Sequence, residues 1–120
     1  MSKPLGPYSP VVRAGDFVIV SGQGGMADGR VVAGGVGAET TQTMKNVAAQ
    51  LATVGAALSD IVKTTCFLTD MENFAAFNEA YQTYFPEDRR PARTTIGVTA
   101  LAVGALVEID MVARRPEGGA

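Results

Sequence analysis

The spacing of apolar residues along this chain switches between a strand-like and a helix-like period, and this alternation restricts the fold more than any other feature. A β-branched run at residues 17–20 predicts a buried strand that ends at Ser21-Gly22. From about residue 38 to residue 58 the period is helical, with Asn46 and Gln50 off the apolar stripe. That stripe consists of Met44, Val47, Leu51, Val54 and Leu58. Residues 61–69 return to a strand-like pattern.

The second half of the chain continues the alternation. Thr69-Asp70-Met71-Glu72 resembles a capping box, and it precedes a second helix that stops at Pro86. The stripe of this helix, Phe74, Phe77, Tyr81 and Tyr84, is expected to be core. Residues 93–98 and 106–113 predict two more strands, and residues 30–32 predict a hairpin partner for 17–20. The order β-β-α-β-α-β-β places two helices on one face of a mixed sheet, an α+β layer.

The length of the chain matches one domain. Its 120 residues and 47% hydrophobic content allow a real core, so we expect residues 1–120 to form one domain, with 114–120 as a flexible tail. Only 18% of residues are charged, which suggests that other subunits cover part of the apolar surface. No apolar stretch reaches membrane-spanning length and no signal peptide is recognisable, so we expect a cytoplasmic protein with no membrane partner.

The lack of histidine and the single cysteine exclude several kinds of active site. The chain has no histidine, which removes Ser-His-Asp and Cys-His nucleophile systems and His-ligated zinc. It has one cysteine, Cys66, so an intrachain disulfide or a multi-cysteine metal cluster is excluded, and we expect Cys66 to be a small buried hydrophobe. The net charge of −2 gives no electrostatic footprint for nucleic acid, which is therefore an unlikely partner.

Polar side chains interrupt the predicted strands at two places. Glu108 and Asp110 share one face of the last strand, where a carboxylate must be solvated, paired or functional. Arg93 begins a strand just after Pro91, and its planar fork suits either a carboxylate ligand or the carbonyls of a nearby loop.

Two further segments are candidates for ligand contact. The glycine and prolines of residues 6–10 hold Tyr8 on a rigid extended arm, either as an apolar anchor with a bonded hydroxyl or as a ligand contact. Ser21-Gly22-Gln23 ends a strand at a turn, where backbone amides can face a ligand, although such a turn is also common in ordinary loops.

Taken in order, five segments closely resemble the Rid family of reactive-intermediate deaminases, also called the YjgF or endoribonuclease L-PSP family. The resemblance runs over residues 5–114. The five segments are Gly6-Pro7-Tyr8-Ser9-Pro10, Val18-Ile19-Val20-Ser21-Gly22-Gln23, Asp60-Ile61-Val62-Lys63-Thr64-Thr65, Pro91-Ala92-Arg93-Thr94-Thr95 and Val107-Glu108-Ile109-Asp110.

The resemblance implies a chorismate-mutase-like fold assembled as a homotrimer, with clefts between neighbouring subunits. It also implies hydrolysis of enamines and imines such as 2-aminoacrylate and 2-iminopropionate to a 2-keto acid and ammonia, without a metal or cofactor. In this family's pattern, Arg93 meets the substrate carboxylate and Glu108 positions the attacking water. Tyr8, Ser21 and Gly22 fall on residues that line the cleft, and we expect Arg93 and Tyr8 to meet across subunit boundaries.

One position departs from the best-known members of the family. Thr95 stands where they commonly carry a cysteine, which changes the polarity of the pocket and its substrate preference. Two alternatives therefore stay open. One is a pathway-specific relative such as an aminoacrylate or 2-aminomuconate hydrolase, and the other is a non-catalytic trimer that binds or senses a small carboxylate such as a 2-keto acid.

Overall fold

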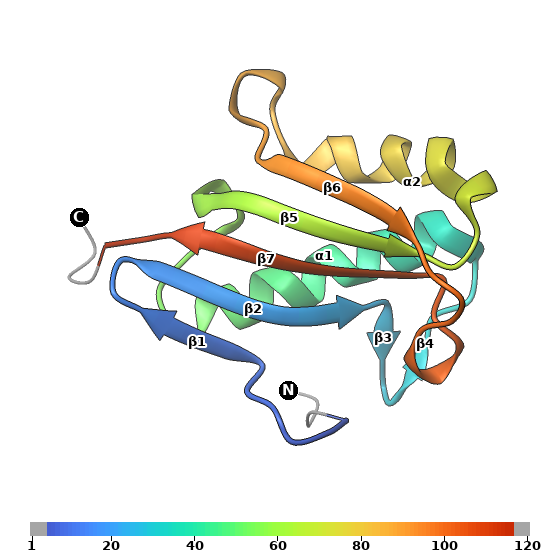
Figure 1. Cartoon of the computed structure of the whole chain (residues 1–120), viewed down its shortest axis with the longest axis horizontal. Coiled ribbons are helices and arrows are strands. Elements are labelled where there is room, and N and C mark those ends of the chain that lie inside the picture. The colour runs from blue at the N-terminus through green and yellow to red at the C-terminus, as the bar shows by residue number, and fades with distance from the viewer. Residues whose placement is uncertain (1–4, 117–120) are drawn as a thin grey trace.

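The computed structural model describes residues 5–116 (Figure 1). Four strands precede the first helix, where the apolar spacing predicts two, and from that helix onward the order of helices and strands is as predicted. The strands are β1 (Val11–Ala14), β2 (Phe17–Gly24), β3 (Met26–Ala27), β4 (Arg30–Val31), β5 (Ile61–Leu68), β6 (Ala92–Gly97) and β7 (Val107–Arg114). The helices are α1 (Gly35–Ala52) and α2 (Phe74–Tyr81), with short 3₁₀ turns on either side of α2 at Met71–Asn73 and Gln82–Tyr84. The predicted α+β class is confirmed.

Five strands form one mixed sheet in the order β1-β2-β7-β5-β6. Strands β5 and β6 are parallel and α2 connects them, whereas the other neighbouring strands are antiparallel. Both helices lie on the same face of the sheet, as predicted (Figure 1). The other face of the sheet is uncovered in the described chain.

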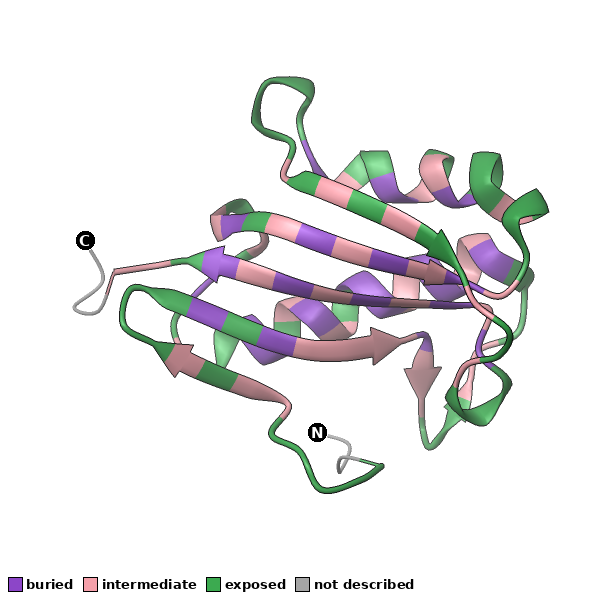
Figure 2. Ribbon diagram, in the orientation of Figure 1, coloured by how far each residue is buried: buried purple, intermediate pink, exposed green. Residues whose placement is uncertain are grey.

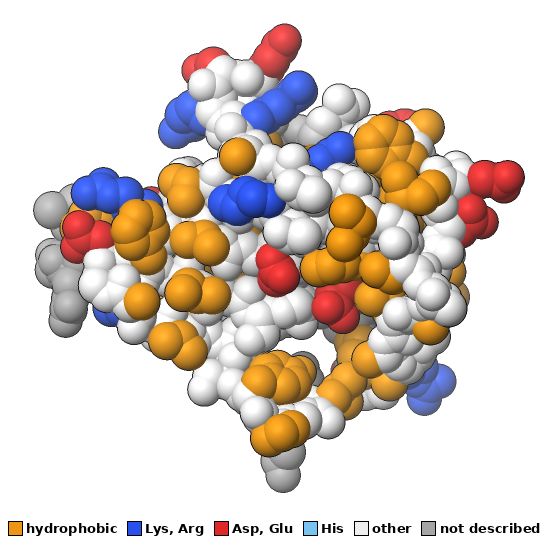
Figure 3. All heavy atoms as spheres, viewed as in Figure 1, with side chains coloured by type: hydrophobic (Ala, Val, Ile, Leu, Met, Phe, Trp, Pro, Cys, Tyr) orange, Lys and Arg blue, Asp and Glu red, His pale blue; other side chains and the backbone are white. Residues whose placement is uncertain are grey.

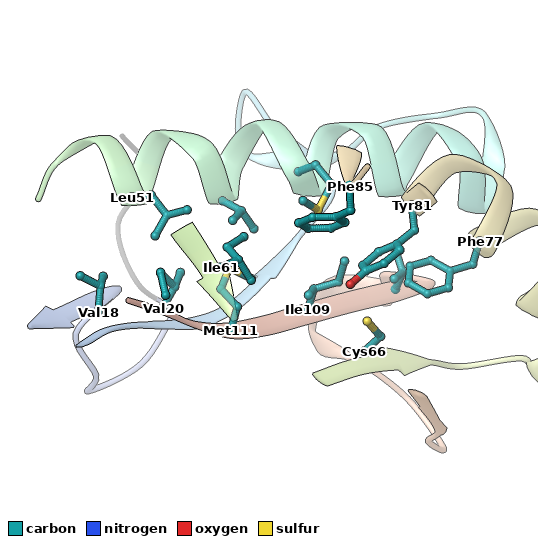
Figure 4. Packing of buried hydrophobic residues seen from close by; sticks show 14 of the residues in the cluster. Val18, Val20, Leu51, Ile61, Cys66, Phe77, Tyr81, Phe85, Ile109 and Met111 are labelled. Carbon is teal, nitrogen blue, oxygen red and sulfur yellow. The ribbon is translucent and has the colours of Figure 1, made fainter. Parts of the chain in front are cut away.

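The core lies between this sheet and the two helices. Alternate residues of β7 are buried and the residues between them are not, as the sequence pattern predicts (Figure 2). Figure 4 shows Leu51 of α1 above Val18 and Val20 of β2, with Tyr81 reaching from α2 toward the sheet near Cys66. The Cys66 side chain is fully buried, as expected.

The C-terminal end of helix α1 comes earlier in the chain than the apolar stripe predicts. It ends at Ala52 rather than near Leu58, because Gly55 takes a φ of 76° and turns the chain. Val54 and Leu58 still pack against the core, but from the segment that follows the helix. The apolar stripe was therefore correct about burial and wrong about the length of the helix.

The predicted hairpin partner of β2 was also wrong. The partner is β1, which the sequence did not reveal, and a two-residue turn at Gly15 joins the pair, with a φ of 62° at that glycine. Because β1 and β7 occupy both edges of β2, the segment at Arg30–Val31 pairs instead with β3 in a separate two-stranded sheet.

The expected flexible tail does not begin at residue 114. Arg114 is the last residue of β7, and the Arg115 amide donates a hydrogen bond to the Asp16 carbonyl oxygen at 2.8 Å. The rest of the expected tail, residues 117–120, lies outside the described residues. Within the described range, no helix is both long enough and apolar enough to cross a membrane.

A buried carboxylate fixes the start of β7. Glu39 of α1 is only 4% exposed, and its Oε1 accepts a hydrogen bond from the Leu106 amide at 2.8 Å. The Leu106 carbonyl oxygen in turn accepts a hydrogen bond from the Thr69 amide at 3.2 Å. Gly25 packs directly over Glu39, and a β-carbon there would lie 2.7 Å from the Glu39 Cα. Helix α1 thus holds the residue that leads into β7.

We expect Glu39→Ala to lower the free energy of unfolding by about 1–3 kcal/mol, because it leaves the Leu106 amide without its acceptor. Glu39→Gln keeps an acceptor oxygen and should cost less. Denaturant titration of both variants measures the difference, with Glu79→Ala, an exposed glutamate of α2, as the matched control. Equal losses for Glu39→Ala and Glu79→Ala would contradict this role for Glu39.

Candidate functional site

Four of the six predicted site residues gather around one cavity of about 440 Å³. These are Tyr8, Ser21, Gly22 and Glu108, and the cavity is called here the Glu108 cavity. It lies between the N-terminal arm, the end of β2, the start of β7 and the loop at 102–105. Figure 3 shows a hollow on the uncovered face of the sheet, beside acidic side chains.

The N-terminal arm is fastened to the end of β2 by two hydrogen bonds. The Ser21 amide donates to the Pro10 carbonyl oxygen at 2.9 Å, and the Ser21 hydroxyl donates to the Ser9 carbonyl oxygen at 2.6 Å. Tyr8 lies on the arm at the rim of the cavity. The residue is 46% exposed, and its hydroxyl accepts a hydrogen bond from the Leu5 amide at 3.2 Å. Ser21 therefore lines the cavity and also holds the N-terminal arm in place.

An irregularity in β2 makes room for Glu108. The pairing between β2 and β7 shifts register between Val20 and Gln23, which is a β-bulge. Gly22 lies within this bulge, and a β-carbon at Gly22 would overlap the Glu108 carboxylate. The bulge and the missing side chain together allow the carboxylate to lie against the backbone of β2.

Glu108 and Asp110 have raised proton affinities. Partial burial raises the pKa of Glu108 above its usual range, and the neighbouring Asp110 carboxylate raises it further. Burial also raises the pKa of Asp110, although a hydrogen bond from Thr65 and the charge of Lys63 oppose that rise. Lys63 is itself held by hydrogen bonds from its Nζ to the Thr65 and Thr94 hydroxyls at 3.3 and 3.2 Å. Within residues 5–116, no hydrogen bond or positive charge offsets the raised pKa of Glu108.

Arg93 lies on a platform of aromatic rings. Its guanidinium carbon is 4.9 Å from the ring centroid of Tyr81, 5.4 Å from that of Phe77 and 5.7 Å from that of Phe74. Within residues 5–116 no hydrogen bond or ion pair engages the guanidinium. Phe77 and Tyr81 are core residues and Tyr84 packs against the core, as predicted, whereas Phe74 is 38% exposed and the prediction was wrong for it. The rings of Phe74, Phe77 and Tyr81 also hold the arginine.

A second cavity, of about 310 Å³, surrounds this arginine and is called here the Arg93 cavity. Its lining consists of Asn78, Tyr81, Gln82, Arg90, Pro91 and Arg93. It shares no lining residue with the Glu108 cavity.

Arg93 and Glu108 face opposite sides of the sheet. Arg93 pairs in register with Thr64, whose side chain is buried on the side of the helices. Glu108 pairs with Phe67, which belongs to the alternate set of β5 residues on the uncovered side. Because residues in register share a face, the Arg93 guanidinium and the Glu108 carboxylate of one chain point to opposite sides of the sheet. The predicted site residues therefore lie in two separate groups.

Thr95 lies on the same side of the sheet as Arg93. It pairs in register with Cys66, and its buried hydroxyl group lies beside the Cys66 thiol. Burial raises the pKa of the Cys66 thiol, which keeps it protonated. Thr95 lines neither of the two cavities, so its contact with a substrate stays a prediction.

Sequence reasoning missed two amide side chains that line the Glu108 cavity. Asn46 donates hydrogen bonds from its Nδ2 to the carbonyl oxygens of Gly24 and Met26, both at 2.9 Å, and so fixes the end of β2. Gln50, one turn further along α1, is only 6% exposed. Both residues lie off the apolar stripe of the predicted helix. Their spacing of four residues puts them on the same side of the helix, and this spacing is the sequence signal that could have identified them.

Between residues 5 and 116 no group of three or more Cys, Asp or Glu side chains is arranged to hold a metal ion. The polar groups that face the two cavities are carboxylate, guanidinium, amide and hydroxyl groups. Such groups bind and orient a small polar molecule and move protons.

Comparisons with known proteins identify the family of this chain. A family model described as endoribonuclease L-PSP matches residues 1–115. The mouse protein named 2-iminobutanoate/2-iminopropanoate deaminase is 40% identical over 111 residues, which cover 91% of this chain and 82% of the mouse protein. A RutC family protein of Pyrococcus horikoshii is 39% identical over 113 residues, covering 92% of this chain and 89% of the relative.

Among solved structures, the YjgF gene product of E. coli has the same fold with a TM-score of 0.86 and 35% sequence identity, covering 93% of this chain and 91% of that chain. The resemblance carried by the five sequence segments is thus confirmed by the family match and by the fold. This chain belongs to the endoribonuclease L-PSP family, also called the Rid or YjgF family.

Proposed function

We propose that this chain hydrolyses small 2-imino acids and their enamine tautomers to 2-keto acids and ammonia. Glu108 is the observation that carries the proposal, because its carboxylate has a raised pKa and faces a cavity. A carboxylate of this kind exchanges protons with water and with an amine near neutral pH more readily than an ordinary glutamate does. The name of the mouse relative, 2-iminobutanoate/2-iminopropanoate deaminase, supports imine chemistry.

The proposed reaction needs only water and a proton carrier. Glu108 accepts a proton from a water molecule as its oxygen bonds to the carbon of a protonated imine, and the C=N π electrons move to nitrogen. Glu108 then protonates the nitrogen of the resulting carbinolamine, and the C–N bond breaks with its electron pair leaving on ammonia. The hydroxyl proton passes through Glu108 to ammonia as the carbonyl forms. One protonated imine and one water become one 2-keto acid and one ammonium ion.

Arg93 supplies the proposed anchor for the substrate. Its guanidinium is held by three rings, and its N–H donors are free of protein partners among residues 5–116. A fork held in this way binds a carboxylate through two parallel hydrogen bonds and fixes the adjacent imine carbon. This supports an acid with a carboxylate next to the reacting carbon as the substrate.

The two half-sites become one site when neighbouring chains meet. In the proposed homotrimer, the uncovered faces of three sheets turn inward, and Arg93 of one chain completes a pocket with Tyr8 and Glu108 of the next. Exposed apolar side chains on the uncovered face support such packing, among them Phe17, Ile19 and Ile96. Figure 3 shows apolar side chains gathered on this face.

Glu108→Gln separates catalysis from binding. The amide keeps the shape of the side chain but cannot accept the proton, so we expect kcat to fall by about 10²- to 10⁴-fold while 2-keto acid binding persists. The assay generates imines from alanine with an amino-acid oxidase and follows their loss by trapping with semicarbazide. If the wild-type chain binds 2-keto acids but accelerates no imine, the non-catalytic carboxylate-binding alternative replaces the proposal.

The pH dependence of kcat/KM tests the proposed role of the Glu108 carboxylate. Protonated Glu108 cannot act as the base, so kcat/KM should fall as the pH drops through its pKa, with a midpoint above the ordinary value of 4.5. Asp110→Asn removes the neighbouring negative charge that raises this pKa, and we expect the acid limb to move to lower pH. An acid limb that stays in place in Asp110→Asn would contradict the assignment of this limb to Glu108.

Gly22→Ala tests the space that the bulge provides. The added methyl group overlaps the Glu108 carboxylate, so we expect a large loss of kcat/KM with little loss of thermal stability. Gly24→Ala is the matched control in the same strand, because its β-carbon would meet only ordinary contacts at 3.7 and 3.9 Å. Both variants are compared by imine assay and thermal unfolding, and equal activities would show that Glu108 does not need this position.

Mixing two inactive variants tests whether neighbouring chains share the site. Arg93→Ala and Glu108→Gln are refolded together, and about a quarter of the sites in random trimers should then carry both intact residues. We expect that fraction of wild-type activity to return, whereas each variant refolded alone stays inactive. No recovery in mixtures of well-folded trimers would contradict a site shared between neighbouring chains.

A further inference from the structure

The Arg93 cavity contains more positive charge than a monocarboxylate substrate requires. Arg90 and Arg93 both line it, together with the amide side chains of Asn78 and Gln82. No aspartate or glutamate lines the cavity, and neither arginine has an ion-pair partner between residues 5 and 116. Two uncompensated guanidinium groups in one cavity of about 310 Å³ favour an anion with more than one negative group.

The backbone sets the spacing of the two arginines. Arg90 has an extended conformation, with φ −74° and ψ 137°, and Pro91 follows it at the entrance to β6. Three residues span at most about 10 Å, so the two Cα atoms are no further apart than that. Two arginine side chains that line one cavity can bind two carboxylates joined by a short carbon chain, one through each guanidinium group.

A third polar side chain lines the cavity beside the two arginines. Asn78 comes from α2, and its amide group can both donate and accept hydrogen bonds. Because this amide is neutral, it does not offset the positive charge of Arg90 and Arg93.

We infer that the Arg93 cavity selects 2-imino dicarboxylic acids of four or five carbons, with Arg93 binding the carboxylate next to the imine carbon and Arg90 binding the distal one. This inference rests on the proposed hydrolysis, because it extends the anchor that Arg93 supplies there. The reaction itself is unchanged: one imine and one water give one 2-keto dicarboxylate and one ammonium ion. Arg90 acts as a specificity residue that recognises the second carboxylate.

The test compares two imines in the same assay, one made from glutamate and one made from alanine by amino-acid oxidases. We expect the wild-type chain to show a higher kcat/KM for the glutamate imine. Arg90→Gln should lower the ratio of the two kcat/KM values about tenfold, mainly through KM, because a charge-assisted hydrogen bond to the distal carboxylate is lost. Added salt should weaken the preference of the wild-type chain as well.

Arg89→Gln is the matched control. Arg89 is adjacent to Arg90 and equally exposed, but it does not line the cavity. We expect it to leave both kcat/KM values unchanged. Equal rates for the two imines in the wild-type chain, or equal effects of Arg89→Gln and Arg90→Gln on the ratio, would overturn the inference.

A binding measurement separates this inference from the proposed function. If the chain accelerates neither imine, the proposed hydrolysis fails, and calorimetry with 2-oxoglutarate and 2-oxobutanoate then decides about the cavity. Tighter binding of 2-oxoglutarate that Arg90→Gln abolishes supports a dicarboxylate site without catalysis. Equal affinity for the two keto acids, or equal weakening by Arg89→Gln, overturns the dicarboxylate site.

Discussion

The alternation of side chains along β7 is the constraint on which the rest of the molecule depends. This strand lies at the centre of the five-stranded sheet, between β2 and β5. Val107, Ile109, Met111 and Ala113 are buried under the helices, and this burial requires Glu108 and Asp110 to point to the uncovered face. A slip of one residue in the pairing would bury both carboxylates and expose four core residues. The stability of the core therefore fixes the direction of the proposed catalytic group.

Local features then adjust the surroundings of Glu108. The bulge in β2 and the absence of a side chain at Gly22 provide space for the carboxylate. The bond from Glu39 to the Leu106 amide holds the chain just before β7, and Asn46 holds the end of β2. Both anchoring side chains come from α1, so one helix supports two sides of the Glu108 cavity.

The sequence predicted the parts of this arrangement that depend on local pattern. The apolar period identified both helices and the long strands, and the alternation in β7 separated Glu108 from the core in advance. The apolar period missed β1, a strand of four residues without a continuous apolar run. It also extended α1 past Gly55, because an apolar stripe does not reveal the left-handed backbone of that glycine. The opposite directions of Arg93 and Glu108 follow from the pairing of β6 and β7 with β5. Pairing between segments that are distant in the sequence cannot be predicted from either segment alone. The spacing of Asn46 and Gln50 places both on one side of α1, but only the tertiary fold brings that side to the cavity.

The ring platform under Arg93 has a consequence for the energetics of ligand capture. A free arginine side chain loses about 2 kcal/mol of rotamer entropy when a ligand immobilises it. Here the contacts with Phe74, Phe77 and Tyr81 impose most of that ordering when the chain folds. All three rings belong to α2, and Phe77 and Tyr81 are also part of the hydrophobic core, with the Tyr81 hydroxyl hydrogen-bonded to Thr64 of β5 at 2.8 Å. The affinity of the proposed anchor is thereby linked to the packing of α2 on the sheet, so a core substitution that loosens α2 would weaken ligand binding as well as stability.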